Sequence, residues 1–234
     1  MKAVSYTFKR VEKKYLLNEN QYSRLKEILI QHMIPDDYAN YTICNIYFDT
    51  DTDLLISKSI EKPYFKEKLR LRSYGAPKDD STVFLEIKRK VNGVVFKRRI
   101  AMPYKNMIEY LKTGNHEGFS GQVFNEIDYF IKYYHPVPKV YLAYEREAFR
   151  GKTDETLRIT FDSKIISREQ NIALSENTKC TSLLKNGQKL MEIKANDAMP
   201  VWLCTALSAL KIFPCSFSKY GMVYKNKLKN TKGA

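Results

Sequence analysis

Residues 84–99 read FLEIKRKVNGVVFKRR, and this stretch decides the fold. Asn92-Gly93 is typical of the two-residue type I′ turn of a β-hairpin, which needs positive φ at both positions. Counted outward from this turn, Lys88 lies opposite Lys97, and directly opposed residues share one face of a sheet. Two facing lysines repel each other unless an anion compensates their charge. The hairpin therefore predicts a cationic sheet face that binds an anion.

The alternation of charged and apolar residues extends over most of the chain. In the hairpin, Glu86 and Arg99 share the face of the lysines, while Leu85 and Ile87 point to the other side. The same period of two, which is typical of β-strands, recurs in segments 5–17, 41–49, 64–74, 82–91, 94–102, 139–149, 156–166 and 188–195.

The architecture must cover the apolar face of these segments and also accommodate their cationic face. A single alternating strand indicates a sheet with one solvated face, and an open basic sheet is the alternative here. Cations on one face of about six strands, with apolar residues on the other, favour a barrel with a charged lumen. The prediction is an α+β fold, an eight-stranded antiparallel β-barrel tunnel with a Lys/Arg-lined lumen and helices packed outside.

Four segments with apolar residues at helical spacing supply these helices. They cover residues 19–33, a segment that begins at Pro103, residues 120–133 and residues 200–211. Asn18 and Gln21 form the pattern of a capping box ahead of the first segment. Because no linker rich in Pro, Gly or Ser divides the chain, we expect a single domain over residues 1–234.

The composition restricts the ligand and the compartment. Lys+Arg number 40 against 26 Asp+Glu, and a formal net charge of +14 predicts an anionic partner such as nucleic acid, a lipid surface or phosphates. Four cysteines without CxxC spacing and three scattered histidines do not form a zinc pattern. No apolar segment is long enough for a membrane span, and we expect a reducing cytoplasm with no direct membrane span.

A lumen with many cations and few glutamates suits phosphate chemistry. The sequence has neither GxxxxGK[ST] nor GxGxxG, so side chains rather than a glycine-rich loop must hold the phosphates. Arg matches phosphate oxygens two at a time, and phosphoryl transfer also needs a divalent metal, for which one or two carboxylates suffice. Glu192 is the first candidate ligand, followed by Glu86 and Glu12. For Glu86, opposite Arg99, an ion pair that spaces the cations is the favoured alternative.

A set of short motifs resembles the VTC branch of the triphosphate tunnel metalloenzymes, or CYTH superfamily. In the order of that family, the motifs run through residues 5–225. They are Arg10-x-Glu12-x-Lys14-Tyr-Leu-Leu, Ile46-Tyr-Phe-Asp49, Lys68-Leu-Arg70-Leu-Arg72-Ser-Tyr74, Leu85-Glu-Ile-Lys88, Tyr144-Glu-Arg146, Leu157-Arg158-Ile-Thr-Phe-Asp162, Met191-Glu192-Ile-Lys194 and Phe217-Ser-Lys219-Tyr220.

The resemblance implies a polyphosphate polymerase that transfers the γ-phosphate of ATP to a growing polyphosphate chain, with Mn²⁺ or Mg²⁺ on Glu192. Carried over by position, the residues that hold the triphosphate and the chain end are Lys14, Arg70, Arg72, Lys88, Arg146, Arg158 and Lys219. The hairpin register adds Lys97 and Arg99, and the strands and motifs add Arg10, Lys68, Tyr144 and Lys194 as substrate-binding candidates.

Other functions stay open at this point. Arg10 stands where the hydrolytic tunnel enzymes carry a glutamate, which disfavours triphosphatase activity. A non-catalytic subunit that binds polyphosphate or pyrophosphate is the main alternative. Nucleic-acid binding rests on charge alone, and a closed lumen would exclude a duplex. Because the chain lacks membrane helices and a phosphate-sensor domain, we expect either a separate membrane partner or a domain that works alone in the cytoplasm.

Overall fold

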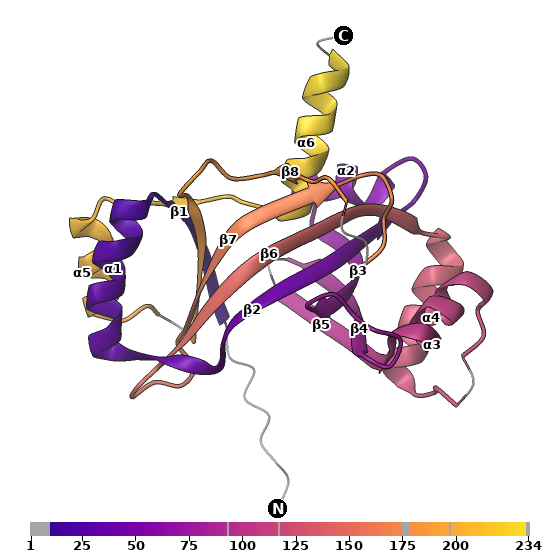
Figure 1. The fold of residues 1–234 in the computed structure, drawn as a ribbon, viewed down its shortest axis with the longest axis horizontal. Coiled ribbons are helices and arrows are strands. Elements are labelled where there is room, and N and C mark those ends of the chain that lie inside the picture. The colour runs from indigo at the N-terminus through magenta and orange to yellow at the C-terminus, as the bar shows by residue number, and fades with distance from the viewer. Residues whose placement is uncertain (1–9, 93, 117, 175–177, 197, 233–234) are drawn as a thin grey trace, which may run out of the picture. The chain divides into compact units, whose positions relative to one another are not determined.

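The computed structural model describes residues 10–92, 94–116, 118–174, 178–196 and 198–232 (Figure 1). The chain divides into two compact units. Unit 1 comprises Met1–Tyr41, Glu145–Lys164 and Leu184–Phe217, and unit 2 comprises Thr42–Tyr144, Ile165–Leu183 and Ser218–Ala234. A single domain over residues 1–234 stays a prediction.

Unit 1 is a sheet with an apolar face under two helices. Its strands are β1 (Arg10–Leu17), β9 (Lys189–Asn196), β10 (Pro214–Cys215) and parts of β2 (Met33–Asp49), β6 (Val137–Gly151) and β7 (Arg158–Arg168). Helices α1 (Glu19–His32) and α5 (Val201–Ala209) lie beside each other (Figure 1). Leu25 and Leu29 of α1 pack with Leu203 of α5 and with Met191 and Ile193 of β9. The helices therefore cover the odd-numbered face of β9, and its even-numbered face is left for polar residues.

The start of α1 confirms the capping box. The side-chain oxygen of Asn18 accepts a hydrogen bond from the backbone N–H of Gln21 at 2.8 Å, and Gln21 Oε1 accepts from the backbone N–H of Asn18 at 3.1 Å. Two of the N–H groups that have no partner within the helix are thereby satisfied, and a cap of this kind contributes about 1 kcal/mol to stability.

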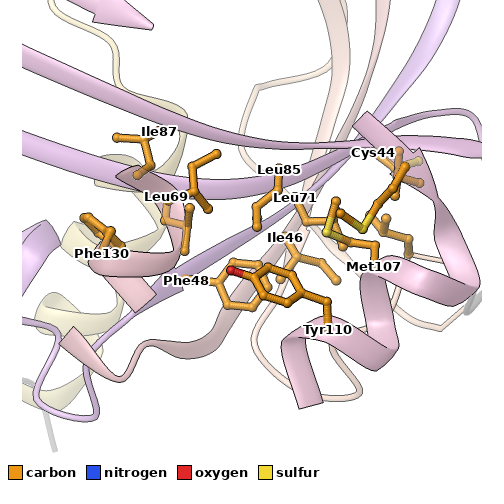
Figure 2. Packing of buried hydrophobic residues seen from close by; sticks show 14 of the residues in the cluster. Cys44, Ile46, Phe48, Leu69, Leu71, Leu85, Ile87, Met107, Tyr110 and Phe130 are labelled. Atoms are coloured by element: carbon orange, nitrogen blue, oxygen red, sulfur yellow. The ribbon is translucent and has the colours of Figure 1, made fainter. Parts of the chain in front are cut away.

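Unit 2 holds the hairpin. Its strands are β3 (Phe65–Tyr74), β4 (Thr82–Val91), β5 (Val94–Pro103), β8 (Thr181–Ser182) and the remaining parts of β2, β6 and β7. Its helices are α2 (Leu54–Ile60), α3 (Tyr104–Thr113), α4 (Gln122–Tyr134) and α6 (Lys219–Lys232). Figure 2 shows Leu69 and Leu85 among the buried side chains that contact Met107 and Tyr110 of α3 and Phe130 of α4. Each fully buried Leu contributes about 1.5–3 kcal/mol, so this apolar face fixes the outward direction of the alternate, charged residues.

The predicted register of the hairpin is confirmed. Lys88 pairs with Lys97 and Glu86 pairs with Arg99 across β4 and β5. Arg98 points to the helix-covered side, where its Nε lies 3.7 Å from Glu126 Oε2 of α4. Residue Gly93 of the turn lies outside the described residues, as do residues 5–9 of the first predicted strand.

The predicted eight-stranded barrel is wrong in strand number and closure. The strands form a ten-stranded sheet in the hydrogen-bonded order β10-β1-β9-β7-β6-β2-β3-β4-β5, with β8 on β7. This path has two ends, so within the described residues the sheet is not closed. The antiparallel α+β class with packed helices is confirmed. Closure depends on the tilt and stagger of whole strands, and two-residue strands such as β8 and β10 are too short to show a period.

The helices were predicted less completely than the strands. The segments 19–33, 103 onward, 120–133 and 200–211 correspond to α1, α3, α4 and α5. Helices α2 and α6 were not predicted, because α2 has seven residues and α6 is mostly polar beyond Tyr224, so neither shows a long apolar pattern. None of the helices in the described ranges is both long and apolar enough to cross a membrane.

Candidate functional site

The face of the unit 2 sheet opposite α3 and α4 carries half of the predicted site cations, and we call it the cationic face. Strand pairing places its side chains in rows across β3, β4 and β5. The cations on these rows are Lys66, Lys68, Arg70, Arg72, Lys88, Lys90, Lys97 and Arg99. Among the described residues paired on this face of the three strands, Glu86 is the acidic one.

One row consists of lysines alone. Lys68 pairs with Lys88, and Lys88 pairs with Lys97, so three ammonium groups follow one another across three neighbouring strands. Burial and then the charges of Lys90, Lys62 and Lys88 lower the pKa of Lys66 in the adjacent row. Directly opposed like charges destabilise a sheet. The cationic face is therefore an arrangement that a multivalent anion would stabilise.

Glu86 lies at the centre of the cationic face and is 2% exposed. Its Oε2 accepts a hydrogen bond from Arg70 Nε at 2.6 Å and lies 3.9 Å from Arg72 Nε, and its Oε1 lies 2.5 Å from Lys97 Nζ. Burial acts to raise the pKa of Glu86, but the charges of Arg70, Arg72 and Lys97 outweigh it and lower the pKa to about 2. Glu86 therefore stays ionised and fixes the positions of Arg70 and Lys97. This geometry fits the ion-pair role that was the alternative to a metal-ligand role.

Arg72 is positioned by Asn45, for which the sequence predicted no role, and by the predicted site residue Tyr144. Its Nε donates to Asn45 Oδ1 at 3.1 Å, and Asn45 Nδ2 donates in turn to the carbonyl of Leu142 at 3.1 Å. Arg72 Nη2 also donates to the hydroxyl of Tyr144 at 3.5 Å. The alternation of Asn45 with apolar neighbours in segment 41–49 was the available signal for its place on this face.

Tyr47, like Asn45, contacts a predicted arginine although the sequence predicted no role for it. Its hydroxyl accepts a hydrogen bond from Arg70 Nη1 at 3.4 Å, and its ring is buried. Burial acts to raise the pKa of Tyr47, but Arg70, Lys68 and Arg72 together lower it to about 8. The cationic face thus favours a phenolate, as it would favour any anion placed there.

We expect Tyr47 to link anion binding to pH. A bound polyanion offsets the cations that stabilise the phenolate, so it raises the pKa of Tyr47, and anion affinity falls as the pH rises above about 8. Without a bound anion, the lowered pKa of Tyr47 in the folded protein stabilises the fold increasingly from about pH 8 to about pH 10, the pKa of an unfolded tyrosine. Tyrosinate absorbance should show a component near pH 8. This component should be absent from Tyr47→Phe and present in Tyr64→Phe, which changes an exposed ring; overlapping titrations of wild type and Tyr47→Phe would contradict the assignment.

Unit 1 gathers a second group of the predicted residues. Lys14 pairs across strands with Glu192, and its Nζ lies 3.3 Å from Glu192 Oε1 and 3.9 Å from Glu12 Oε1. Arg146 donates two hydrogen bonds to Asp162, from Nε at 2.6 Å and from Nη2 at 2.8 Å, and its Nη2 lies 4.0 Å from Glu192 Oε2. Asp162 belongs to one of the sequence motifs, but its bidentate hydrogen bonding with Arg146 was not predicted.

The carboxylates of unit 1 fit a divalent metal better than Glu86 does. Glu192 and Glu12 both approach the ammonium nitrogen of Lys14, so their oxygens converge on a point where a cation is held. Two carboxylates with phosphate oxygens and water complete the shell that Mg²⁺ prefers. Both oxygens of Glu86 already face Arg or Lys nitrogens. No group of three His, Cys, Asp or Glu side chains at ligand spacing occurs within the described ranges.

The remaining predicted residues are less tightly grouped. Arg158 forms an ion pair with Asp36, and the guanidinium of Arg99 lies 4.9 Å from the ring centre of Phe84. Lys194 pairs in the β-ladder with both Glu12 of β1 and Arg158 of β7. The backbone of Arg10 is part of β1, whereas its side chain lies outside the described residues.

Comparisons with known proteins agree with the resemblance. The family model described as the VTC domain matches residues 9–226. A candidate adenylate cyclase from Bacillus halodurans has a similar structure, with a TM-score of 0.55, 15% identity, and 89% of this chain and 93% of that chain covered. A candidate adenylyl cyclase from Hippeastrum, described as having a dominant triphosphatase activity, has a TM-score of 0.55 at 14% identity and covers 93% of this chain and 96% of its own. These two likenesses show the fold alone. A sequence search found no match among curated proteins.

Proposed function

Since the chain belongs to the VTC domain family, we propose that it is a metal-dependent polyphosphate polymerase. It transfers the γ-phosphate of ATP to the end of a polyphosphate chain. The observation that carries this proposal is the row Lys68, Lys88 and Lys97 beside Arg70 and its partner Glu86. Such a run of like charges is stabilised by a linear anion with many charges, which is the chemistry of polyphosphate and of the triphosphate of ATP.

Each part of the cationic face has a role in this proposal. Arg70 and Arg72 present guanidinium groups that match two phosphate oxygens at a time. Glu86 holds Arg70 and Lys97 by ion pairs, so the donors are oriented before the substrate arrives. Lys68 and Lys88 would supply further positive charge along the chain of phosphates. Phosphoryl transfer needs mainly positioning and charge neutralisation, and these side chains provide both.

The unit 1 residues have separate roles. Lys14, Arg146 and Arg158 would bind phosphate oxygens, and Glu192 with Glu12 would hold Mn²⁺ or Mg²⁺. Such an ion, when bound to the phosphates, neutralises charge that develops on the transferred group. Binding of an anion by Lys14 would also release both carboxylates from its ammonium group, because the lysine exchanges one negative partner for another.

A second candidate function is non-catalytic binding of polyphosphate or pyrophosphate. It is favoured by the ion pairs that already engage Glu86 and Glu192. The Hippeastrum protein is described as having a triphosphatase activity. In this chain, Arg10 replaces the glutamate of the hydrolytic tunnel enzymes and disfavours that activity. The cytoplasmic location and a separate membrane-protein partner stay predictions.

The direct test is synthesis of polyphosphate by the purified chain. With ATP and Mn²⁺ or Mg²⁺, we expect long products on a gel stained for polyphosphate. Arg70→Ala should lower polyphosphate affinity by about tenfold or more, because it removes charge-assisted hydrogen bonds. Arg98→Ala is the matched control, since it removes the same charge from the opposite face of β5.

The outcomes separate the two functions. Polyphosphate binding without synthesis from ATP would favour the non-catalytic subunit. If Arg98→Ala weakens binding as much as Arg70→Ala does, net charge rather than the cationic face determines affinity, and the proposal fails.

A further inference from the structure

Three consecutive residues at the start of α6 contact the cationic face of unit 2. The first is Ser218, whose hydroxyl oxygen accepts the backbone N–H of Gly221 at 3.2 Å and thus caps the helix. The same oxygen accepts a hydrogen bond from Lys68 Nζ at 3.1 Å. A Cβ on Gly221 would lie 3.1 Å from the side chain of Ser218, so the glycine leaves room for this cap. The helix start is thereby joined to the lysine row.

The second contact is made by Lys219. Its Nζ lies 4.4 Å from the ring centre of Tyr144, and the residue is 8% exposed. Tyr144 accepts a hydrogen bond from Arg72, so Lys219 and Arg72 meet at one aromatic side chain. A cation–π contact of this kind holds an ammonium group without neutralising it. Lys219 therefore keeps its positive charge in this contact with Tyr144.

The third contact is made by Tyr220, which is 3% exposed. Its hydroxyl donates to Asp49 Oδ2 at 3.0 Å, and its ring stacks on Tyr47 with ring centres 4.9 Å apart. Burial and then the charge of Asp49 raise the pKa of Tyr220. The phenol consequently stays protonated and remains a donor throughout the neutral range.

Asp49 is a rigid acceptor for this hydroxyl. It is fully buried, and its two carboxylate oxygens accept the backbone N–H groups of Thr50, Leu55 and Ile56, each at 2.8 Å. Asp49 therefore ties the end of β2 to the first turn of α2. A hydrogen bond to such an acceptor fixes its donor in direction as well as in distance.

We propose that Tyr220 is a positioning residue: by its hydrogen bond to Asp49 it fixes the first turn of α6 and so holds Lys219 on the cationic face. Adjacent residues of a helix are coupled through the backbone, so the place of Lys219 follows from that of Tyr220. The inference rests on the proposed function in one respect, namely that the anion bound by Lys219 is a polyphosphate. The structure assigns this role to Tyr220 and its acceptor Asp49, two motif residues for which the sequence predicted no role of their own.

The test compares Tyr220→Phe, Lys219→Met and the double variant. Tyr220→Phe keeps the ring that stacks on Tyr47 and removes only the hydroxyl. We expect it to weaken polyphosphate binding about tenfold, the effect of one hydrogen bond to a charged group. In the Lys219→Met background the same change should have no further effect, because it acts through the lysine. Lys227→Gln is the control, since Lys227 ties a later turn of α6 to Asp53 at 3.0 Å.

A second measurement does not depend on the ligand. In the protein without polyphosphate, Tyr220→Phe should increase the rate at which an acylating reagent modifies Lys219, measured by peptide mass spectrometry. Lys227→Gln should leave that rate unchanged. Equal labelling of Lys219 in wild type and Tyr220→Phe would overturn the positioning role, as would additive losses of affinity in the double variant. Faster labelling in a chain that binds no polyphosphate would instead support the positioning role and refute the proposed function.

Discussion

Replacing Glu192 with glutamine is expected to lower polyphosphate synthesis about 100-fold or more while polyphosphate binding is retained. Glutamine has the size of glutamate but lacks the charge that would anchor a divalent cation beside Glu12. Turnover depends on that cation, because charge develops on the transferred phosphoryl group. Binding depends on Lys and Arg, and loss of a negative charge 3.3 Å from Lys14 Nζ leaves this lysine more attractive to an anion. Synthesis from ATP and affinity for polyphosphate should be measured on the same preparation.

Glu145→Gln is the matched control for this variant. Glu145 also lies in unit 1, but its ion pair with Lys164 at 2.8 Å is exposed on both sides. An exposed pair contributes little, so both rate and affinity should match those of wild type. Synthesis at the wild-type rate by Glu192→Gln would show that the metal is held elsewhere, and Glu12 would then be the next residue to change.

The faces of the strands and the pairing of β4 with β5 could be predicted because they depend on local features. The Asn92-Gly93 sequence predicts a type I′ turn, from which the pairing of Lys88 with Lys97 follows, and the period of two then gives the face of each residue along both strands. Leu85 and Ile87 alternate with Glu86 and Lys88 along β4 and need to be covered by helices. The charged residues must therefore point to the opposite face of the sheet. The cationic face follows from these features alone.

The course of the sheet and the residues behind the cations could not be predicted in this way. Closure is a property of all strands together. The contact of Tyr220 with Asp49 joins positions 171 residues apart in sequence, and the contact of Asn45 with Arg72 joins positions 27 apart. No periodicity encodes such pairs. Alternation could show that Asn45 and Tyr47 share the face of the cations, but only the packed structure shows which cation each one touches.

Glu86→Gln is expected to cause the largest loss of stability among the variants of the cationic face. It removes the carboxylate that lies 2.6 Å from Arg70 Nε and 2.5 Å from Lys97 Nζ. Breaking one partner of a buried ion pair costs about 3–5 kcal/mol, because the other charge stays buried without compensation. For a chain of this length the lower figure corresponds to a fall of about 10 °C in Tm. Thermal unfolding followed by circular dichroism would measure it, with Glu145→Gln as the exposed control.

The acid sensitivity of the wild type should have the same origin. Glu86 has a pKa lowered from 4.5 to about 2, so its contribution is fully present above pH 4.5 and is lost as the pH falls toward 2. Glu86→Gln should therefore differ from wild type in Tm at neutral pH and approach it at low pH. A constant difference in Tm across this range would show that packing, not charge, causes the loss.

Polyphosphate should reverse the destabilisation of Glu86→Gln, because a bound anion supplies the charge that the glutamate supplied. At 100 times its dissociation constant a ligand adds about 2.7 kcal/mol by mass action, which is close to the smaller estimate of the loss. The rise in Tm with polyphosphate should be larger in Glu86→Gln than in wild type, since neither Arg70 nor Lys97 then pairs with a carboxylate at position 86. High salt should reduce both rises by screening the charges. A variant whose Tm does not respond to saturating polyphosphate would show that Arg70 and Lys97 do not bind it.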